Sequence, residues 1–144
     1  MPSIVSYQKA SDATTTYQLA TPDGATELCT INGTTYVTLP DGAKLPEQPK
    51  QIAASVKPVA MNDALKEAIK AASPHCQLIS DRMQEMIRAK YPLEDELAYA
   101  RIGIGAAHKL YAPTQEEFTN IAAFGAFVEG VRQWGRDERA KLGL

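Results

Sequence analysis

From Thr14 to Leu39 the chain alternates short apolar or threonine-rich runs with turn residues. The turn signals are Pro22-Asp23-Gly24, Asn32-Gly33 and Pro40-Asp41-Gly42. Asn32-Gly33 is the strongest of them, because a two-residue type I′ turn needs positive φ at both central residues, which Asn and Gly tolerate. The pattern therefore predicts a β-hairpin centred on Asn32-Gly33.

This turn also sets the register of the two predicted strands by pairing Ile31 with Thr34. The register further predicts Leu28 opposite Val37 and Thr26 opposite Leu39 on one face, and Cys29 opposite Tyr36 on the other. Residues 17–21 are expected to add a third strand and complete a β-meander. A meander of about 25 residues buries too little apolar surface to be stable alone, so it must pack on the second half or on a partner.

Residues 43–60 follow neither a strand period nor a helical one. They contain Pro46, Pro49 and Pro58, which lack a backbone donor and favour extended backbone. We expect a mostly extended connector here, between a threonine-rich β-region at residues 1–42 and a helical domain at residues 61–144.

Beyond residue 60 the apolar positions recur with a helical period. Asn62 is a suitable N-cap for a short helix, and Ser73-Pro74 can start a second helix that Pro92 ends. The apolar stripe expected on the second helix is Cys76, Ile79, Met83, Met86 and Ile87.

Two further helices follow. One begins near Leu93, with three carboxylates in its first turn that complement the helix dipole, and its stripe comprises Leu93, Leu97, Ala100, Ile104 and Ala107. Thr114 and Glu117 form a capping box for the last helix, at about residues 115–140, and Gly143 is placed to stop it. Its buried side is expected to hold Phe118, Ile121, Ala122, Phe124, Phe127, Val128, Val131 and Trp134. The predicted fold class is α+β, mainly α, with an N-terminal antiparallel β-meander and a compact three-to-four-helix C-terminal module.

Composition narrows the class of protein. The 144 residues carry a net charge of −2 and a pI of about 5.7, which argues against a nucleic-acid binder, since that would need a basic face. The N-terminus lacks a basic segment followed by an apolar one, and no run is long enough to span a membrane. We expect a cytoplasmic protein that binds neither nucleic acid nor membrane.

The chain offers little candidate chemistry. Cys29 and Cys76 fall in different predicted parts without metal-ligand spacing, so we interpret them as buried reduced thiols. His75 beside Cys76 is a poor catalytic dyad, because adjacent helical residues point in different directions. The acidic pairs lie at helix ends or beside arginines, where capping and solvation explain them. We therefore predict no catalytic, cofactor-binding or metal-ligating residues.

Aromatic and arginine residues gather near the end of the last helix. Phe127, Arg132, Trp134 and Arg136 are residue types that are common in protein-interface hot spots, so they are candidate partner contacts. The alternative is that Phe127 and Trp134 pack in the core while the arginines are solvated. The sequence leaves both interpretations open.

Two segments of the helical part resemble a known group of proteins. They are Met86-Ile87-Arg88-Ala89-Lys90-Tyr91-Pro92-Leu93-Glu94-Asp95-Glu96, and Phe127-Val128-Glu129 with Arg132-Gln133-Trp134-Gly135-Arg136. Over about residues 75–142 the chain resembles small tail-fibre-associated and tail-fibre assembly proteins of tailed bacteriophages, which carry such segments in a helical C-terminal region.

The resemblance implies a protein without enzymatic activity or cofactor that binds phage tail-fibre or tail proteins. It would act as an assembly chaperone in the cytoplasm of the bacterial host, or as a permanent component of the virion tail. A host-interacting regulator or anti-defence protein is the remaining alternative, and the formation of a homo-oligomer is left open.

Overall fold

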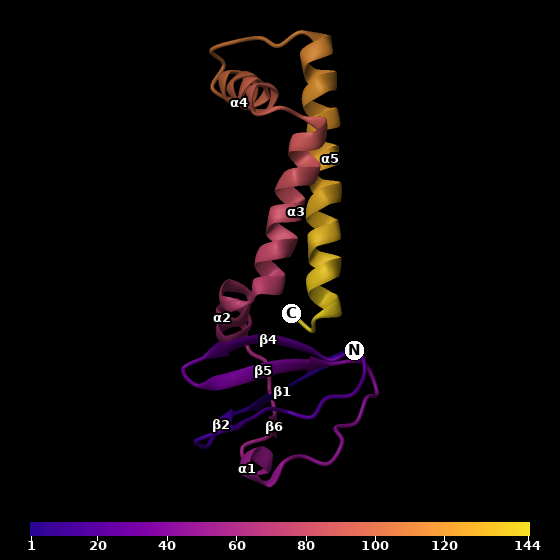
Figure 1. The fold of residues 1–144 in the computed structure, drawn as a ribbon. Helices are drawn as coiled ribbons and strands as arrows, with labels where there is room; N and C mark the ends of the chain where they lie inside the picture. Colours follow the sequence, from indigo (N-terminus) through magenta and orange to yellow (C-terminus); the bar gives the residue numbers. More distant parts are fainter. The chain divides into compact units, whose positions relative to one another are not determined.

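The computed structural model describes residues 1–144, which form two compact units (Figure 1). One unit comprises residues 1–78 and 138–144, and the other comprises residues 79–137. An antiparallel four-stranded sheet is followed by a helical C-terminal module, with 51% helix and 16% strand. The predicted α+β, mainly α fold class is confirmed at this level.

The sheet has the strand order β4-β5-β1-β6. Its strands are β1 (Ser3–Tyr7), β4 (Thr26–Ile31), β5 (Thr34–Leu39) and β6 (Lys57–Pro58). The predicted hairpin joins β4 to β5, and Ile31 pairs with Thr34. Asn32 and Gly33 have φ of 49° and 79°, as a type I′ turn requires. The prediction of this turn is confirmed.

The predicted register is wrong beyond Cys29, because β4 contains a β-bulge. Cys29 pairs with Tyr36 as expected, but Glu27 lies opposite Val37, which leaves Leu28 as the extra residue. Thr26 accordingly pairs with Thr38 instead of Leu39. The bulge lets Leu28 and Cys29, although adjacent in the chain, join the same hydrophobic cluster.

The third strand beside the hairpin is also different from the prediction. Residues 17–21 were expected to join β4 through the Pro22-Asp23-Gly24 turn, but β4 is an edge strand of the sheet, and the third strand is β1, which pairs with β5 along its whole length. Instead β3 (Thr16–Tyr17) pairs with β2 (Ala10–Ser11) in a separate two-stranded sheet. The backbone N–H and C=O of Ala20 are bonded by the side-chain amide of Gln48, each at 2.9 Å. The sheet is therefore not the sequential meander that was expected, because the first strand of the chain is an inner strand of it.

Both faces of the sheet are covered. The first cluster, which holds residues of β1, β4, α2, α3 and the C-terminus, consists of Ile4, Leu28, Cys29, Ile69, Cys76 and Leu144. The second cluster consists of Val5, Tyr7, Leu19, Val37, Leu39 and Ile52. Ile4 and Val5 belong to opposite clusters because successive strand residues point to opposite faces.

Residues 43–60 were expected to be a mostly extended connector at a domain boundary. They contain the short helix α1 (Lys50–Ala53) and the edge strand β6. Ile52 of α1 is only 1% exposed in the second cluster. This segment therefore packs as part of the sheet unit, and the two compact units divide the chain elsewhere.

The four predicted helices are confirmed. They are α2 (Asp63–Ala72), α3 (Pro74–Lys90), α4 (Leu93–Ala107) and α5 (Gln115–Lys141). The Asn62 side chain accepts the Leu65 N–H at 2.9 Å, so the N-cap of α2 forms as predicted. Gly143 has a φ of 79° and ends the chain's last helical turn.

The burial expected along these helices is only partly seen. α4 has no buried residue. On the apolar side predicted for α5, Val131 is buried, Phe118 and Ala122 are exposed, and the others are half-buried: Ile121, Phe124, Phe127, Val128 and Trp134. None of the helices combines the length and apolarity that crossing a membrane would need.

Candidate interaction surface

Helix α4 is apolar on two opposite sides, and only one of them packs within the chain. Tyr99 and Ile102 are half-buried, and the Tyr99 ring lies 5.4 Å from the ring of Phe124 on α5. On the other side Leu97 and Ile104 are 45% and 62% exposed. The helix thus turns one apolar side inward and leaves the other uncovered.

We call the uncovered side the outer face of α4. It consists of Leu93, Leu97, Ala100, Ile104 and Ala107, all of which are exposed. The sequence identified this stripe as the apolar side of the helix, but the side that packs within the chain is the one with Tyr99 and Ile102. A helix with two apolar sides gives no local reason for one side rather than the other to face the rest of the chain. Packing within the chain, such as that of Tyr99 against Phe124, decides which side is covered.

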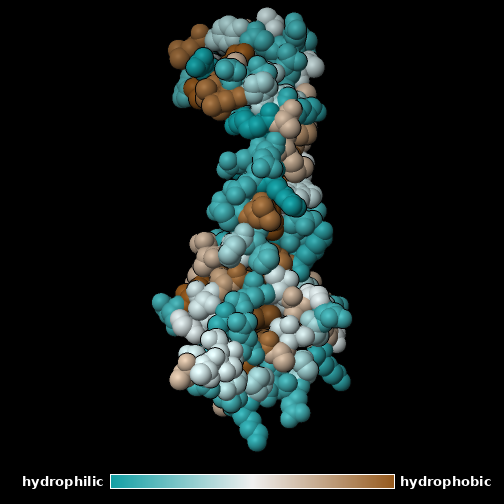
Figure 2. All heavy atoms as spheres, viewed as in Figure 1, coloured by the Kyte–Doolittle hydropathy of each residue, from teal (hydrophilic) through white to brown (hydrophobic).

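The segment that links α4 to α5 and the first turn of α5 carry further exposed apolar side chains. We call them the turn residues: Leu110, Tyr111 and Phe118 are 83%, 47% and 51% exposed. Hydrophobic atoms gather over α4 and this turn at the upper left of Figure 2. The sequence assigned Phe118 to the buried side of α5, which is incorrect because its side chain is 51% exposed.

Backbone and side-chain hydrogen bonds fix this turn. Lys109 adopts a φ of 57°, and the Leu110 N–H donates to the Gly105 C=O at 2.9 Å, which closes α4 in a Schellman-type cap. At the start of α5 the predicted capping box forms, since the Glu117 N–H donates to Thr114 Oγ1 at 3.2 Å. The turn residues are therefore exposed on a loop and a helix start whose backbone conformation is fixed by these hydrogen bonds.

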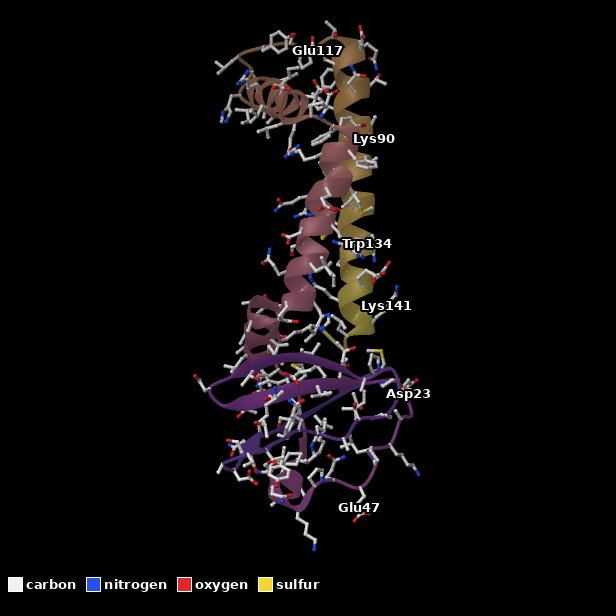
Figure 3. All side chains as sticks on the ribbon, in the orientation of Figure 1. Asp23, Glu47, Lys90, Glu117, Trp134 and Lys141 are labelled. Atoms are coloured by element: carbon white, nitrogen blue, oxygen red, sulfur yellow. The ribbon has the colours of Figure 1, made fainter.

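Tyr111 and Glu117 tie the turn to the start of α5 (Figure 3 labels Glu117). The Tyr111 hydroxyl donates to Glu117 Oε1 at 2.6 Å, and the Thr114 N–H donates to the same oxygen at 3.3 Å. The Tyr111 hydrogen bond, followed by those from Thr114, lowers the pKa of Glu117, while the same carboxylate raises the pKa of Tyr111.

Of the residues predicted to contact a partner, Phe127 lies in an aromatic cluster. Its ring centroid is 5.6 Å from that of Tyr91, and Lys90 Nζ lies 4.5 Å from it in a cation–π contact. Phe127 is half-buried. This position agrees with the packing alternative that the sequence left open for Phe127.

Arg132, Trp134 and Arg136 lie one to two turns further along α5 (Figure 3 labels Trp134). Arg132 and Arg136 are exposed, and Trp134 is half-buried. Arg136 Nη2 donates to Glu129 Oε1 and, at 2.9 Å, to Gln133 Oε1. Arg136 lowers the pKa of Glu129 through this hydrogen bond and its charge. Phe127 and the two arginines are therefore not part of one contact cluster, and their role as partner contacts stays a prediction.

The sulfur and imidazole groups do not form a reactive site. Cys29 and Cys76 are buried, as predicted, but they lie in the same cluster instead of separate parts. Burial, and then the proximity of Cys76, raises the pKa of the Cys29 thiol, which disfavours the nucleophilic thiolate. His75 is exposed while Cys76 is buried. No group of three or more His, Cys, Asp or Glu residues is placed to hold a metal ion.

Comparison with known proteins returned no match to any family model, any curated protein or any solved structure.

Proposed function

We propose that this chain is a bacteriophage tail-fibre-associated protein that acts as a non-enzymatic assembly chaperone in the host cytoplasm. The proposal rests on the resemblance of the segments at residues 86–96 and 127–136 to tail-fibre assembly proteins. The partner would be an unassembled fibre or tail chain, which exposes apolar surface and strand edges before it trimerises.

The observation that carries this proposal is the exposure of the turn residues. Leu110, Tyr111 and Phe118 expose apolar side chains to solvent. Leu110 and Tyr111 lie on a loop that the capping interactions fix, and Phe118 lies in the first turn of α5. Large apolar anchors on a preorganised loop are suited to bind a partner, because little conformational entropy is lost on binding. An enzyme would need a group of reactive side chains at its site, whereas Leu110 and Phe118 are apolar.

The structure favours a chaperone over an adaptor whose N-terminal segment acts as an extended arm. Residues 3–7 form an inner strand of the sheet, and Tyr7 is 1% exposed. Withdrawing β1 to reach a neighbouring subunit would break its pairing with β5 and open both clusters. A tail component that uses the turn residues instead would be found in the finished virion.

Co-expression with the tail-fibre protein of the same phage tests the proposal. Leu110→Asp combined with Phe118→Asp should lower the yield of soluble fibre trimer about tenfold, because both anchors are lost. The matched control is Ala112→Asp combined with Asn120→Asp, which adds the same charges at exposed neighbouring positions and should leave the yield unchanged.

A fibre yield that does not depend on the chain at all would reject the chaperone proposal. Mass spectrometry of purified virions separates the two forms of the hypothesis, since a chaperone is absent from the particle and a tail component is present at a fixed stoichiometry. Far-UV circular dichroism of the variants checks that their helices are intact.

A further inference from the structure

The outer face of α4 has the spacing of a coiled-coil seam. Its residues follow one another at intervals of four, three, four and three, which makes Leu97 and Ile104 a positions and Leu93, Ala100 and Ala107 d positions of a heptad. All five are exposed. The seam is therefore complete on the helix but has no partner helix within the chain.

Charged residues beside the seam indicate what covers it. Glu94 and Arg101 are seven residues apart and so occupy the same heptad position on one flank. Both are exposed, and neither takes part in an ion pair within the chain. One flank thus carries an unpaired acid near its start and an unpaired base two turns later.

We propose that the outer face of α4 binds the same face of a second copy of this chain in an antiparallel, two-fold symmetric pair. Reversal of the second helix brings Glu94 of each copy beside Arg101 of the other. The dimer then contains two Glu94–Arg101 ion pairs, which are related by the two-fold axis. The same reversal sets Leu97 against Ala100 of the second copy, and Leu93 against Ile104. Large residues then face small ones at the centre of the pair, which lets the two helices approach closely.

A parallel pair fits these residues less well. It would direct Arg101 toward Glu96 of the second copy and leave Glu94 without a partner. Glu96 is already in an ion pair with Arg88 of its own chain. The antiparallel arrangement uses the two charges that are free and leaves the existing ion pair intact.

Sedimentation equilibrium of the purified full chain, without fibre protein, tests this inference. The measurement extends to roughly 1 mM chain, because a short interface gives a weak dimer. Glu94→Arg and Arg101→Glu should each raise the dimer dissociation constant about tenfold, since each variant puts like charges together at two symmetric positions. The control, Asp95→Arg, makes the same charge change in the same helical turn but away from the seam, and should leave the constant unchanged.

Mixing the two variants gives the decisive result. The Glu94→Arg chain is basic at both flank positions and the Arg101→Glu chain is acidic at both, so their equimolar mixture should form a heterodimer with the dissociation constant of the unmodified homodimer. Leu97→Asp should abolish association. A chain that stays monomeric over the whole range overturns the inference, and so does Glu94→Arg that leaves the dissociation constant unchanged. Fibre solubility is measured separately and depends on the turn residues, so either proposal can fail alone.

Discussion

At the residue scale, Glu117 combines a helix cap with the Tyr111 hydrogen bond. Its pKa lies below the ordinary value of 4.5, because Tyr111 and then Thr114 bond the charged form. The stabilisation is therefore present above the unfolded-state pKa and is lost as the pH falls through the folded-state pKa. We predict that Tyr111→Phe raises the pKa of Glu117 toward its ordinary value, as measured by a carboxyl-carbon NMR titration.

Glu129 provides the internal reference for that titration. Its pKa is lowered by Arg136, first through a hydrogen bond and then through charge, and Tyr111 takes no part. The Glu129 titration should therefore be the same in Tyr111→Phe and in the unmodified chain. An unchanged pKa for Glu117 would mean that the Tyr111 hydrogen bond does not persist in solution.

At the element scale, the bulge in β4 places Leu28 in the first cluster, together with its neighbour Cys29. Leu28 is 1% exposed in the first cluster, so Leu28→Ala leaves a cavity and should lower the free energy of unfolding by about 2–5 kcal/mol. Leu97→Ala removes the same atoms from the outer face of α4, and should change it by less than about 0.5 kcal/mol. Urea denaturation of dilute protein measures both.

The comparison of these two leucines tests the burial of Leu28. Equal losses of stability in the two variants would contradict the structure, because they would mean that Leu28 is not enclosed by the first cluster.

At the scale of the whole molecule, the first cluster joins residues from both ends of the chain. Leu144 is 7% exposed against Ile4 and Leu28, and its N–H donates to the Arg139 C=O at 3.1 Å as the helix ends at Gly143. We predict that Leu144→Ala lowers the free energy of unfolding by about 2 kcal/mol. Amide hydrogen exchange should show faster exchange in β1 and β4, and Leu110→Ala, at an exposed position, should leave those rates unchanged.

The candidate surface could be predicted only in part. The sequence placed partner contacts at Phe127, Arg132, Trp134 and Arg136 on the basis of residue type, and the structure brings Phe127 into an aromatic cluster instead. The sequence did not point to Leu110, because this residue belongs to none of the predicted apolar stripes. A sign of the outer face was nevertheless present, since α4 also carries Tyr99 and Ile102 outside the recognised stripe.

By itself, the sequence determined the features that depend on a few neighbouring residues. The turn at Asn32-Gly33, the caps at Asn62 and Thr114, and the stop at Gly143 all arise from hydrogen bonds and φ preferences within about five positions. These features fixed the hairpin turn, the start of α2 and both ends of α5.

Only the tertiary structure decided the choices between locally equivalent solutions. Strand β1 joins β5 as the third strand, whereas residues 17–21 do not join β4 as expected. The bulge sends Leu28 to the first cluster. Helix α4 packs its half-buried Tyr99 against the chain and leaves Leu97 exposed, although both sides of the helix are apolar. Such choices depend on apolar contacts between residues that are distant in the chain, and no local period or turn preference encodes them.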